Sequence, residues 1–194
     1  MNKLQREKIW DPVTRMWHWV LALAIVVNWS FGTFMSFDTV EWHFYTGYLI
    51  LGLLAFRLLW GFVGPRPVRF RTFLNNTPAS TWQYFKTLTR REPSGTPGHN
   101  PLGSLAVLAM LTVIAGQGFS GLFIEADDFF EYGPLNGYVS EATVKFMSGW
   151  HHTLADVILV LVILHVVVIL FYLFWKRENL IKPMINGWKW VRRQ

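Results

Sequence analysis

The sequence contains no cysteine, and few of its residues are charged. Without cysteine the chain has no disulfide, no cysteine-held iron–sulfur cluster, no thiolate nucleophile and no thioether-linked c-type haem. Any cofactor must therefore be held without such a link. Charged residues make up 15% of the 194 residues, whereas soluble domains usually carry about 25%. We therefore expect much of the surface to face something other than water.

Long apolar stretches are abundant, and 52% of the residues are hydrophobic. A membrane-spanning helix needs roughly 20 mostly apolar residues, and lipid requires helices because unpaired backbone groups cannot face it. The sequence predicts one all-α domain over residues 1–194, an integral membrane four-helix bundle. The predicted helices are about 12–36, 42–63, 101–124 and 149–175, joined by a cytoplasmic connection at 65–100 and a periplasmic connection at 125–149.

The charges are divided unevenly between the two ends of these helices. Every basic residue except Lys145 lies before residue 16, between residues 57 and 91, or after residue 175. A four-span topology places these three segments on one side, so the positive-inside rule predicts that both termini are cytoplasmic. The opposite side carries Asp38, Glu41, Glu125, Asp127, Asp128, Glu131 and Glu141. Such a division argues against nucleic-acid binding, despite a net charge of +6.

Two local patterns lie on the predicted cytoplasmic side. Asp11 followed by Pro12 is typical of the N-cap and first residue of a helix. The connection contains an amphipathic stretch, residues 80–89, with four large apolar or aromatic side chains: Trp82, Tyr84, Phe85 and Leu88. We expect this stretch to lie on the membrane surface.

The histidines suggest a cofactor through their spacing. The sequence has six: His18, His43, His99, His151, His152 and His165. A lone histidine near a helix end is more often a hydrogen-bonded residue than a ligand. His151 and His165, however, are 14 residues apart on one predicted helix. At about 100° and 1.5 Å per residue they share a face to within roughly 40° and are about 21 Å apart. His152 falls on nearly the opposite face, so His151 is the favoured ligand.

The topology supplies a partner for each of these two histidines. His43 begins the second predicted helix, level with His151 on the periplasmic side, and His18 lies two turns into the first, level with His165 on the cytoplasmic side. Paired imidazoles on facing helices of a bundle suit b-type haems. We therefore expect two haem b groups, with iron ligands His18 and His165 in one and His43 and His151 in the other. Zinc is less suitable, since its ligands must converge in one site.

Two arginines and a glycine-rich run are further candidates. Arg15 lies one turn before His18, and Arg57 lies 14 residues after His43 on the same face; both are predicted to contact haem propionates. Snorkelling of Arg57 to lipid phosphate is an equal alternative. The run at 116–121 matches G-x-G-x-x-G, but no strand precedes it, so its glycines are expected to allow close packing instead.

Several motifs together point to a family. They are residues 10–15 with His18 and Trp19, residues 43–47, 57–65, 69–70, 98–103 and 151–155, His165, and the tail around 179–187. With them the sequence resembles the prokaryotic cytochrome b561 family, which includes the b-type subunits of nickel–iron hydrogenases. More distantly, it resembles the gamma subunit of formate dehydrogenase.

The resemblance implies a multi-pass protein of the bacterial inner (cytoplasmic) membrane that exchanges electrons between quinone and a redox partner. It also implies a cytoplasmic-side quinone site lined by His99, Asn100 and Gly103, with His99 as proton donor or acceptor. The alternative is that residues 98–103 form only a tight turn and a helix N-cap.

Three functions are compatible with these features. The leading hypothesis is a dihaem membrane cytochrome between the quinone pool and a periplasmic c-type cytochrome or hydrogenase-like subunit. A stand-alone superoxide:quinone oxidoreductase is the alternative, although an acidic outer face repels superoxide. The third is a membrane anchor subunit in which the histidines are incidental. Membrane lipid is an expected partner, a homodimer is left open, and no catalytic residue is assigned.

Overall fold

The computed structural model describes residues 4–74 and 76–192. The chain divides into two compact units, which are described separately here. Unit 1 comprises residues 1–18, 57–109 and 162–194, and unit 2 comprises residues 19–56 and 110–161. Lys3 and Arg193, which belong to the predicted basic side, lie outside the described residues.

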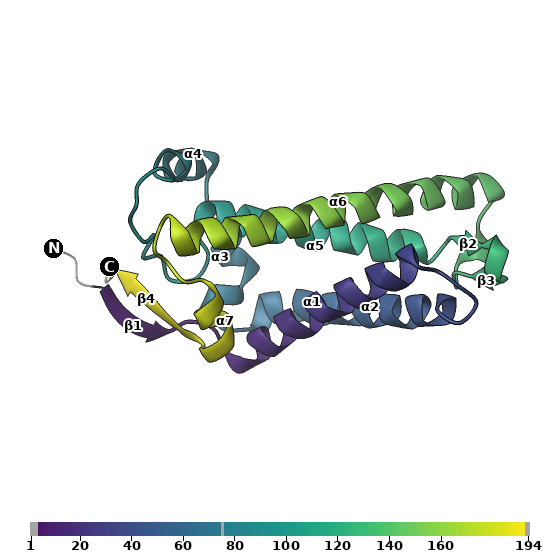
Figure 1. Cartoon of the computed structure of the whole chain (residues 1–194), viewed down its shortest axis with the longest axis horizontal. Helices are drawn as coiled ribbons and strands as arrows, with labels where there is room; N and C mark the ends of the chain where they lie inside the picture. The colour runs from purple at the N-terminus through teal and green to yellow at the C-terminus, as the bar shows by residue number, and fades with distance from the viewer. Residues whose placement is uncertain (1–3, 75, 193–194) are drawn as a thin grey trace. The chain divides into compact units, whose positions relative to one another are not determined.

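In the part of the chain that the structure describes, four helices are long and apolar enough to cross a membrane, as predicted. They are α1 (Pro12–Thr33), α2 (Val40–Val63), α5 (Pro101–Gly121) and α6 (Glu141–Phe174), labelled in Figure 1. Each helix contributes one segment to unit 1 and one to unit 2. Large apolar side chains such as Leu23 and Leu59 are two-thirds exposed, as expected of surfaces that face lipid.

The helix ends differ from the predicted ones by a few residues, and most at the start of α6. This helix begins at Glu141 rather than near residue 149. Ser140 precedes it, and its Oγ accepts a hydrogen bond from the Thr143 backbone N–H at 3.3 Å, which is typical of an N-cap. The first turns of α6 contain polar residues, so hydropathy alone placed the start too late.

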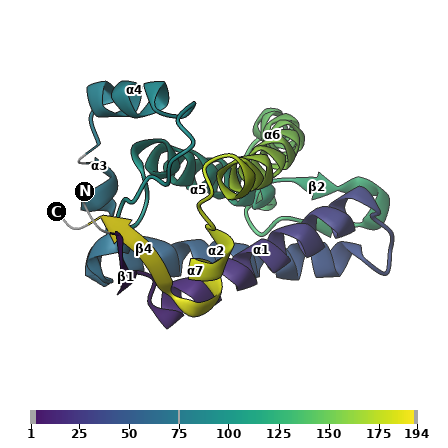
Figure 2. The same ribbon diagram turned by 60° about the vertical axis from the view of Figure 1, so that its left-hand side comes forward.

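Among residues 4–74 and 76–192, two short antiparallel sheets add to the predicted all-α fold. In unit 1, β1 (Leu4–Lys8) pairs with β4 (Trp188–Arg192), as Figure 2 shows from the side. In unit 2, β2 (Glu125–Ala126) pairs with β3 (Glu131–Tyr132), and the short 3-10 turns η2 (Asp127–Phe129) and η3 (Asn136–Tyr138) complete the loop before α6. Strands of two to five residues are too short to be predicted from their own pattern.

Unit 1 contains further short elements besides its helix segments. They are η1 (Arg66–Val68), α3 (Phe70–Leu74), α4 (Pro78–Lys86) and α7 (Ile181–Asn186). The predicted cap of α1 is confirmed, because Asp11 accepts hydrogen bonds from the backbone N–H and the hydroxyl of Thr14 at 2.9 and 2.6 Å. Trp60 Nε1 donates to the same hydroxyl at 3.1 Å, which ties α2 to the start of α1.

The amphipathic stretch of the connection forms α4. Thr77 caps it by accepting a hydrogen bond from the Ser80 backbone N–H at 3.1 Å. Trp82 and Phe85 are more than half exposed and stack with ring centres 5.7 Å apart, and the Lys86 ammonium lies 5.5 Å from the Trp82 ring. Its placement on the membrane surface stays a prediction.

Candidate functional site

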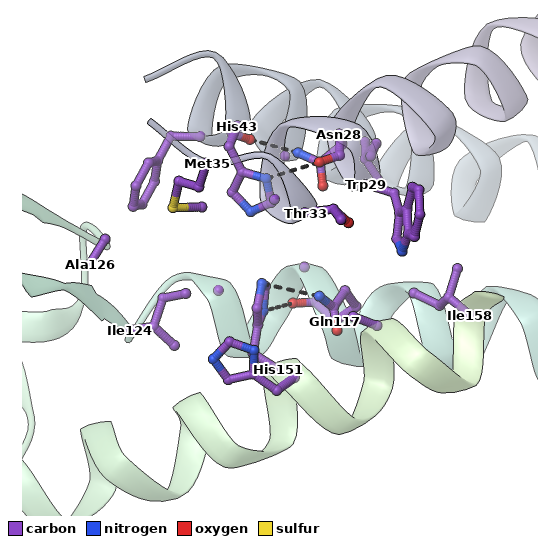
Figure 3. Close-up of a pocket in the computed structure, with 18 of the residues that line it drawn as sticks. Asn28, Trp29, Thr33, Met35, His43, Gln117, Ile124, Ala126, His151 and Ile158 are labelled. Carbon is purple, nitrogen blue, oxygen red and sulfur yellow. Dashed lines mark hydrogen bonds between the residues drawn. The ribbon is translucent and has the colours of Figure 1, made fainter. Parts of the chain in front are cut away.

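In unit 2, His43 of α2 and His151 of α6 approach one another from opposite sides of a cavity (Figure 3). Their ring centres are 6.2 Å apart and their ring planes lie at 79°. Two imidazoles that bind one metal ion through nitrogens about 2 Å from it have ring centres roughly 6 Å apart. The spacing therefore fits a shared metal ion between the rings.

The cavity between these rings has a volume of about 700 Å³. Cofactor pockets usually measure about 300–1,000 Å³ and are mostly apolar. Apolar side chains such as Ile25, Leu51 and Ile158 line this one, and so do Gly47 and Ala155, each one turn after a histidine. These small residues leave room beside the rings for a flat, largely apolar group.

The ring of His43 is oriented by α1. Its Nδ1 lies 3.0 Å from the backbone oxygen of Asn28, and because a carbonyl oxygen only accepts, Nδ1 carries the proton. The side-chain amide of Asn28 donates to the backbone oxygen of His43 at 2.7 Å and to the Thr46 hydroxyl at 2.8 Å. The Nε2 lone pair of His43 is thereby left available for a metal.

The ring of His151 is oriented by α5 in a similar way. Its Nδ1 lies 3.1 Å from the backbone oxygen of Gln117. The amide nitrogen of Gln117 lies 3.1 Å from His151 Nε2, so this amide donates to the lone pair that a metal would take and must turn aside for binding. Gln117 was missed by the sequence reasoning, although a polar residue inside an apolar helix is a recognisable signal of a site.

His152 follows His151 in the sequence and also lines the cavity. The ring opposite His43, however, is that of His151. This arrangement supports the preference for His151 that helix periodicity predicts.

Unit 1 holds the second predicted pair. The ring centres of His18 in α1 and His165 in α6 are 6.5 Å apart, with ring planes at 50°. This distance is close to that of the pair in unit 2, so the structure brings together both predicted pairs.

Arg57 is buried in unit 1, with only 4% of its surface exposed. One guanidinium nitrogen, Nη2, donates to the Val68 backbone oxygen at 2.9 Å, and the group lies 4.9 Å from the Phe70 ring centre and 5.7 Å from that of Trp17. The other, Nη1, is buried without a hydrogen-bond partner among the described residues. Burial is inconsistent with snorkelling to lipid, and the remaining donor suits an anionic oxygen.

Arg15 is partly engaged by the C-terminal segment. Its Nη1 donates to the backbone oxygen of Ile185 in α7. Its Nε is buried and has no hydrogen-bond partner in the described part of the chain. The contact with α7 was not predicted, since it joins residues at opposite ends of the sequence.

The segment before α5 forms the N-cap that was the alternative to a quinone site. Asn100 Oδ1 accepts a hydrogen bond from the Gly103 backbone N–H at 2.7 Å. The Asn100 amide nitrogen donates to the Tyr172 hydroxyl at 3.0 Å, and that hydroxyl lies 2.7 Å from the hydroxyl of Tyr84. Both the oxygen and the nitrogen of the Asn100 amide are therefore already hydrogen-bonded within the protein.

His99 is packed between two aromatic rings. The ring centres of Trp10 and Phe73 lie 4.8 and 5.1 Å from its own. Its Nδ1 is buried without a hydrogen-bond partner among the described residues. Burial, with the positive charges of Lys189 and Arg57 acting in the same direction, lowers the pKa of His99 to about 3. His99 is therefore neutral near pH 7 and has one polar atom to offer a ligand.

The residues present fit haem b. Each unit supplies two facing imidazoles at a spacing that suits one iron, and in unit 2 both have Nδ1 bonded to a helix carbonyl. The unit 2 cavity is mostly apolar, and unit 1 holds a buried arginine donor suited to a carboxylate. Zinc is disfavoured, because no group of three or more His, Cys, Asp or Glu that could hold a metal ion occurs among residues 4–74 and 76–192.

Comparisons with known proteins agree with this chemistry. The prokaryotic cytochrome b561 family matches residues 9–187. The chain is 28% identical over 218 residues to a "Probable Ni/Fe-hydrogenase B-type cytochrome subunit" of Azotobacter vinelandii, a match that covers 93% of this chain and 87% of that protein. A protein of the same description from Rhizobium leguminosarum bv. viciae is 27% identical over 209 residues, covering 92% and 87%. The "Probable Ni/Fe-hydrogenase 1 B-type cytochrome subunit" of Escherichia coli (strain K12) is 25% identical over 213 residues, covering 93% and 89%.

No solved structure matches the chain. The family match nevertheless extends over nearly all of it, including all four long apolar helices and both histidine pairs. The chain therefore belongs to the prokaryotic cytochrome b561 family and is a multi-pass membrane protein of haem b electron transport.

Proposed function

We propose that this chain is a dihaem b-type cytochrome that transfers electrons between the quinone pool and a periplasmic redox partner. The observation that carries the proposal is the recurrence of one geometry, two facing imidazoles with ring centres 6.5 Å apart in unit 1 and 6.2 Å apart in unit 2. We assign His18 and His165 to the cytoplasmic-side haem and His43 and His151 to the periplasmic-side haem.

Each haem, when bound, supplies an iron ion that accepts and releases single electrons. The protein holds the imidazole ligands in place. In unit 2 the Nδ1–H groups of His43 and His151 donate to helix carbonyls, which keeps both rings neutral. Nε2 of each ring would then bind the iron, once the Gln117 amide has turned away from His151. The mostly apolar lining of the cavity would limit the access of water to the iron, which favours electron transfer over reaction with solvent.

The arginines of unit 1 would neutralise the propionates of the cytoplasmic-side haem. Arg57 has a buried Nη1 without a hydrogen-bond partner in the described chain, and Arg15 has a buried Nε in the same condition. Carboxylate oxygens at hydrogen-bond distance would give both nitrogens an acceptor, since guanidinium and carboxylate pair strongly.

A quinone site would lie beside the cytoplasmic-side haem, at His99. Support comes from its buried Nδ1, which has no hydrogen-bond partner in the described part of the chain. A histidine with a pKa near 3 is neutral at pH 7 and has no extra proton to transfer. His99 would therefore act by hydrogen bonding to a quinone oxygen. Asn100 and Gly103 would shape the turn rather than donate to the ligand, since their bond to each other is already made.

The periplasmic partner would dock on the acidic end of unit 2. Glu125 and Asp128 are exposed there and also line the cavity. Phe37 and Phe130 are exposed beside them, at 68% and 76%. Such a surface suits a partner with a basic patch around an aromatic or apolar centre. The relatives are described as Ni/Fe-hydrogenase B-type cytochrome subunits, which favours a hydrogenase-like subunit over a c-type cytochrome.

The proposal is tested on the purified full-length protein by a reduced-minus-oxidised spectrum and by haem per chain. We expect a b-type alpha band, two haems per chain, and reduction by a short-chain quinol. Absence of the band would overturn the proposal and leave the membrane-anchor function. Rapid haem reduction by superoxide, without a quinol or partner protein, would favour the stand-alone oxidoreductase instead.

A further inference from the structure

Each histidine of the unit 2 cavity places Nδ1 against a backbone oxygen of another helix. Nδ1 of His43 lies 3.0 Å from the backbone oxygen of Asn28 in α1, and Nδ1 of His151 lies 3.1 Å from the backbone oxygen of Gln117 in α5. The Ser120 hydroxyl also donates to the Gln117 oxygen at 2.9 Å and lies 3.2 Å from His151 Nδ1. A helix carbonyl already accepts the N–H four residues later, so it can accept an imidazole as well only where the space beside its oxygen is sterically accessible.

A glycine stands four residues after each of these carbonyls, Gly32 in α1 and Gly121 in α5. In a helix, the side chain at this position leans back over the carbonyl four residues before it. A Cβ on Gly32 would lie 2.9 Å from Cε1 and 3.2 Å from Nδ1 of His43. A Cβ on Gly121 would lie 3.0 Å from Cε1 and 3.4 Å from Nδ1 of His151. Each imidazole therefore occupies the space that any other residue would fill.

We propose that Gly32 and Gly121 are positioning residues for His43 and His151, which would ligate the periplasmic-side haem. By exposing a helix carbonyl, each glycine lets one imidazole donate Nδ1–H to it, which fixes the tautomer and the ring orientation. This inference rests on the proposed role of His43 and His151. A hydrogen bond from Nδ1–H makes the imidazole a more basic ligand, which stabilises oxidised iron and keeps the reduction potential low.

The test uses the full-length haem-loaded protein with Gly32→Ala and Gly121→Ala. Each alanine pushes one ring away from its carbonyl. We expect a shift of one of the two reduction potentials to more positive values and a changed low-spin electron paramagnetic resonance signal for that haem, or loss of one haem per chain. The other haem keeps its potential and signal, which also reports a folded chain. Unchanged values in both variants, or loss of both haems, would overturn the inference.

Two glycines of the same unit provide matched controls. A Cβ on Gly116 of α5 would lie 3.2 Å from Leu154 Cδ1, a comparable contact that involves no histidine and no residue lining the cavity, and a Cβ on Gly52 of α2 would meet nothing within 4 Å. We expect Gly116→Ala to lower stability slightly and Gly52→Ala to change nothing, with both potentials kept in each. If Gly116→Ala shifted the same haem as Gly121→Ala, the effect would be general packing and the inference would fail.

The histidine variants separate this inference from the function on which it rests. If His43→Ala loses one haem while the glycine variants behave as wild type, the dihaem function stands and the positioning role is wrong. If His43→Ala keeps both haems with unchanged potentials, the ligand assignment itself is wrong, and the positioning role fails with it.

Discussion

Adjacent residues in α6 face different surroundings. His151 lies opposite His43 and bonds to a carbonyl of α5, whereas His152 lies beside it with ring planes at 84°. One residue of helix corresponds to a rotation of about 100°. Two neighbouring histidines therefore cannot both ligate the same iron from this helix.

This difference gives a direct prediction for the two residues. His151→Ala should remove one of two haems per chain, because a haem with only one remaining protein ligand binds much more weakly. His152→Ala should leave both haems bound. Haem per chain, measured as the pyridine adduct against protein mass, checks both outcomes. Equal haem loss in the two variants would contradict the assignment of His151.

His99 predicts a pH dependence of stability. Burial lowers its pKa in the folded protein to about 3, whereas an unfolded chain has a histidine pKa near 6.5. The unfolded state therefore binds the proton first, so this contribution is complete above pH 6.5 and decreases as the pH falls towards 3. The limit of the loss is about 1.4 kcal/mol per pH unit.

The measurement is thermal unfolding in detergent between pH 4 and pH 7, followed by tryptophan fluorescence. His99→Gln should flatten the decrease in unfolding temperature below pH 6.5, because glutamine takes up no proton. A variant with the same acid dependence as the wild type would show that His99 does not titrate in this way.

At the scale of elements, a buried ion pair joins β4 to the segment after α6, and both of its residues form hydrogen bonds with the connection before α5. Lys189 and Glu178 are 3.2 Å apart, each with a side chain 7% exposed. Lys189 also donates to the Gly98 backbone oxygen at 3.2 Å, and Glu178 accepts two hydrogen bonds from Ser94 at 2.7 and 2.9 Å. The C-terminal segment thereby holds the turn that carries His99.

Breaking this pair should destabilise unit 1. Glu178→Gln leaves the Lys189 charge buried and unpaired, which costs about 3–5 kcal/mol in comparable sites. The double change Glu178→Gln with Lys189→Met should cost less than the single change, because no unpaired charge remains. Unfolding temperatures measure both, with the exposed Lys182→Met as a control expected to stay near wild type. A single variant as stable as the control would contradict the prediction.

At the scale of the whole molecule, the basic residues are divided unequally between the two units. Lys145 is the one basic residue in the sequence of unit 2, whereas unit 1 contains all the others and both ends of the chain. The positive-inside rule therefore predicts that unit 1 lies on the cytoplasmic side.

The absence of cysteine makes this orientation simple to test. Tyr138 in η3 is 85% exposed in unit 2, and Lys182 in α7 is exposed in unit 1. A membrane-impermeant thiol reagent should label Tyr138→Cys in intact spheroplasts and should label Lys182→Cys only after permeabilisation. The reverse pattern would place both termini in the periplasm.

Much of the architecture follows from periodic patterns within single segments. Apolar runs predict the four membrane helices, and the Asp11–Pro12 pair predicts the start of α1, because length, hydropathy and capping depend on near neighbours. The two histidine pairs could be predicted because the rotation and rise per residue of a helix are fixed. The order of the membrane spans then gives the depth of each histidine in the membrane.

The remaining features depend on contacts between segments far apart in the sequence. The pairing of β1 with β4, the burial of Arg57 against Val68 and the bond from Arg15 to α7 each need a partner that no local pattern identifies. The sequence by itself determined which helices span the membrane and which histidines lie at the same depth in it. Only the tertiary structure decided how the imidazoles are held, because the carbonyls to which they bond belong to other helices.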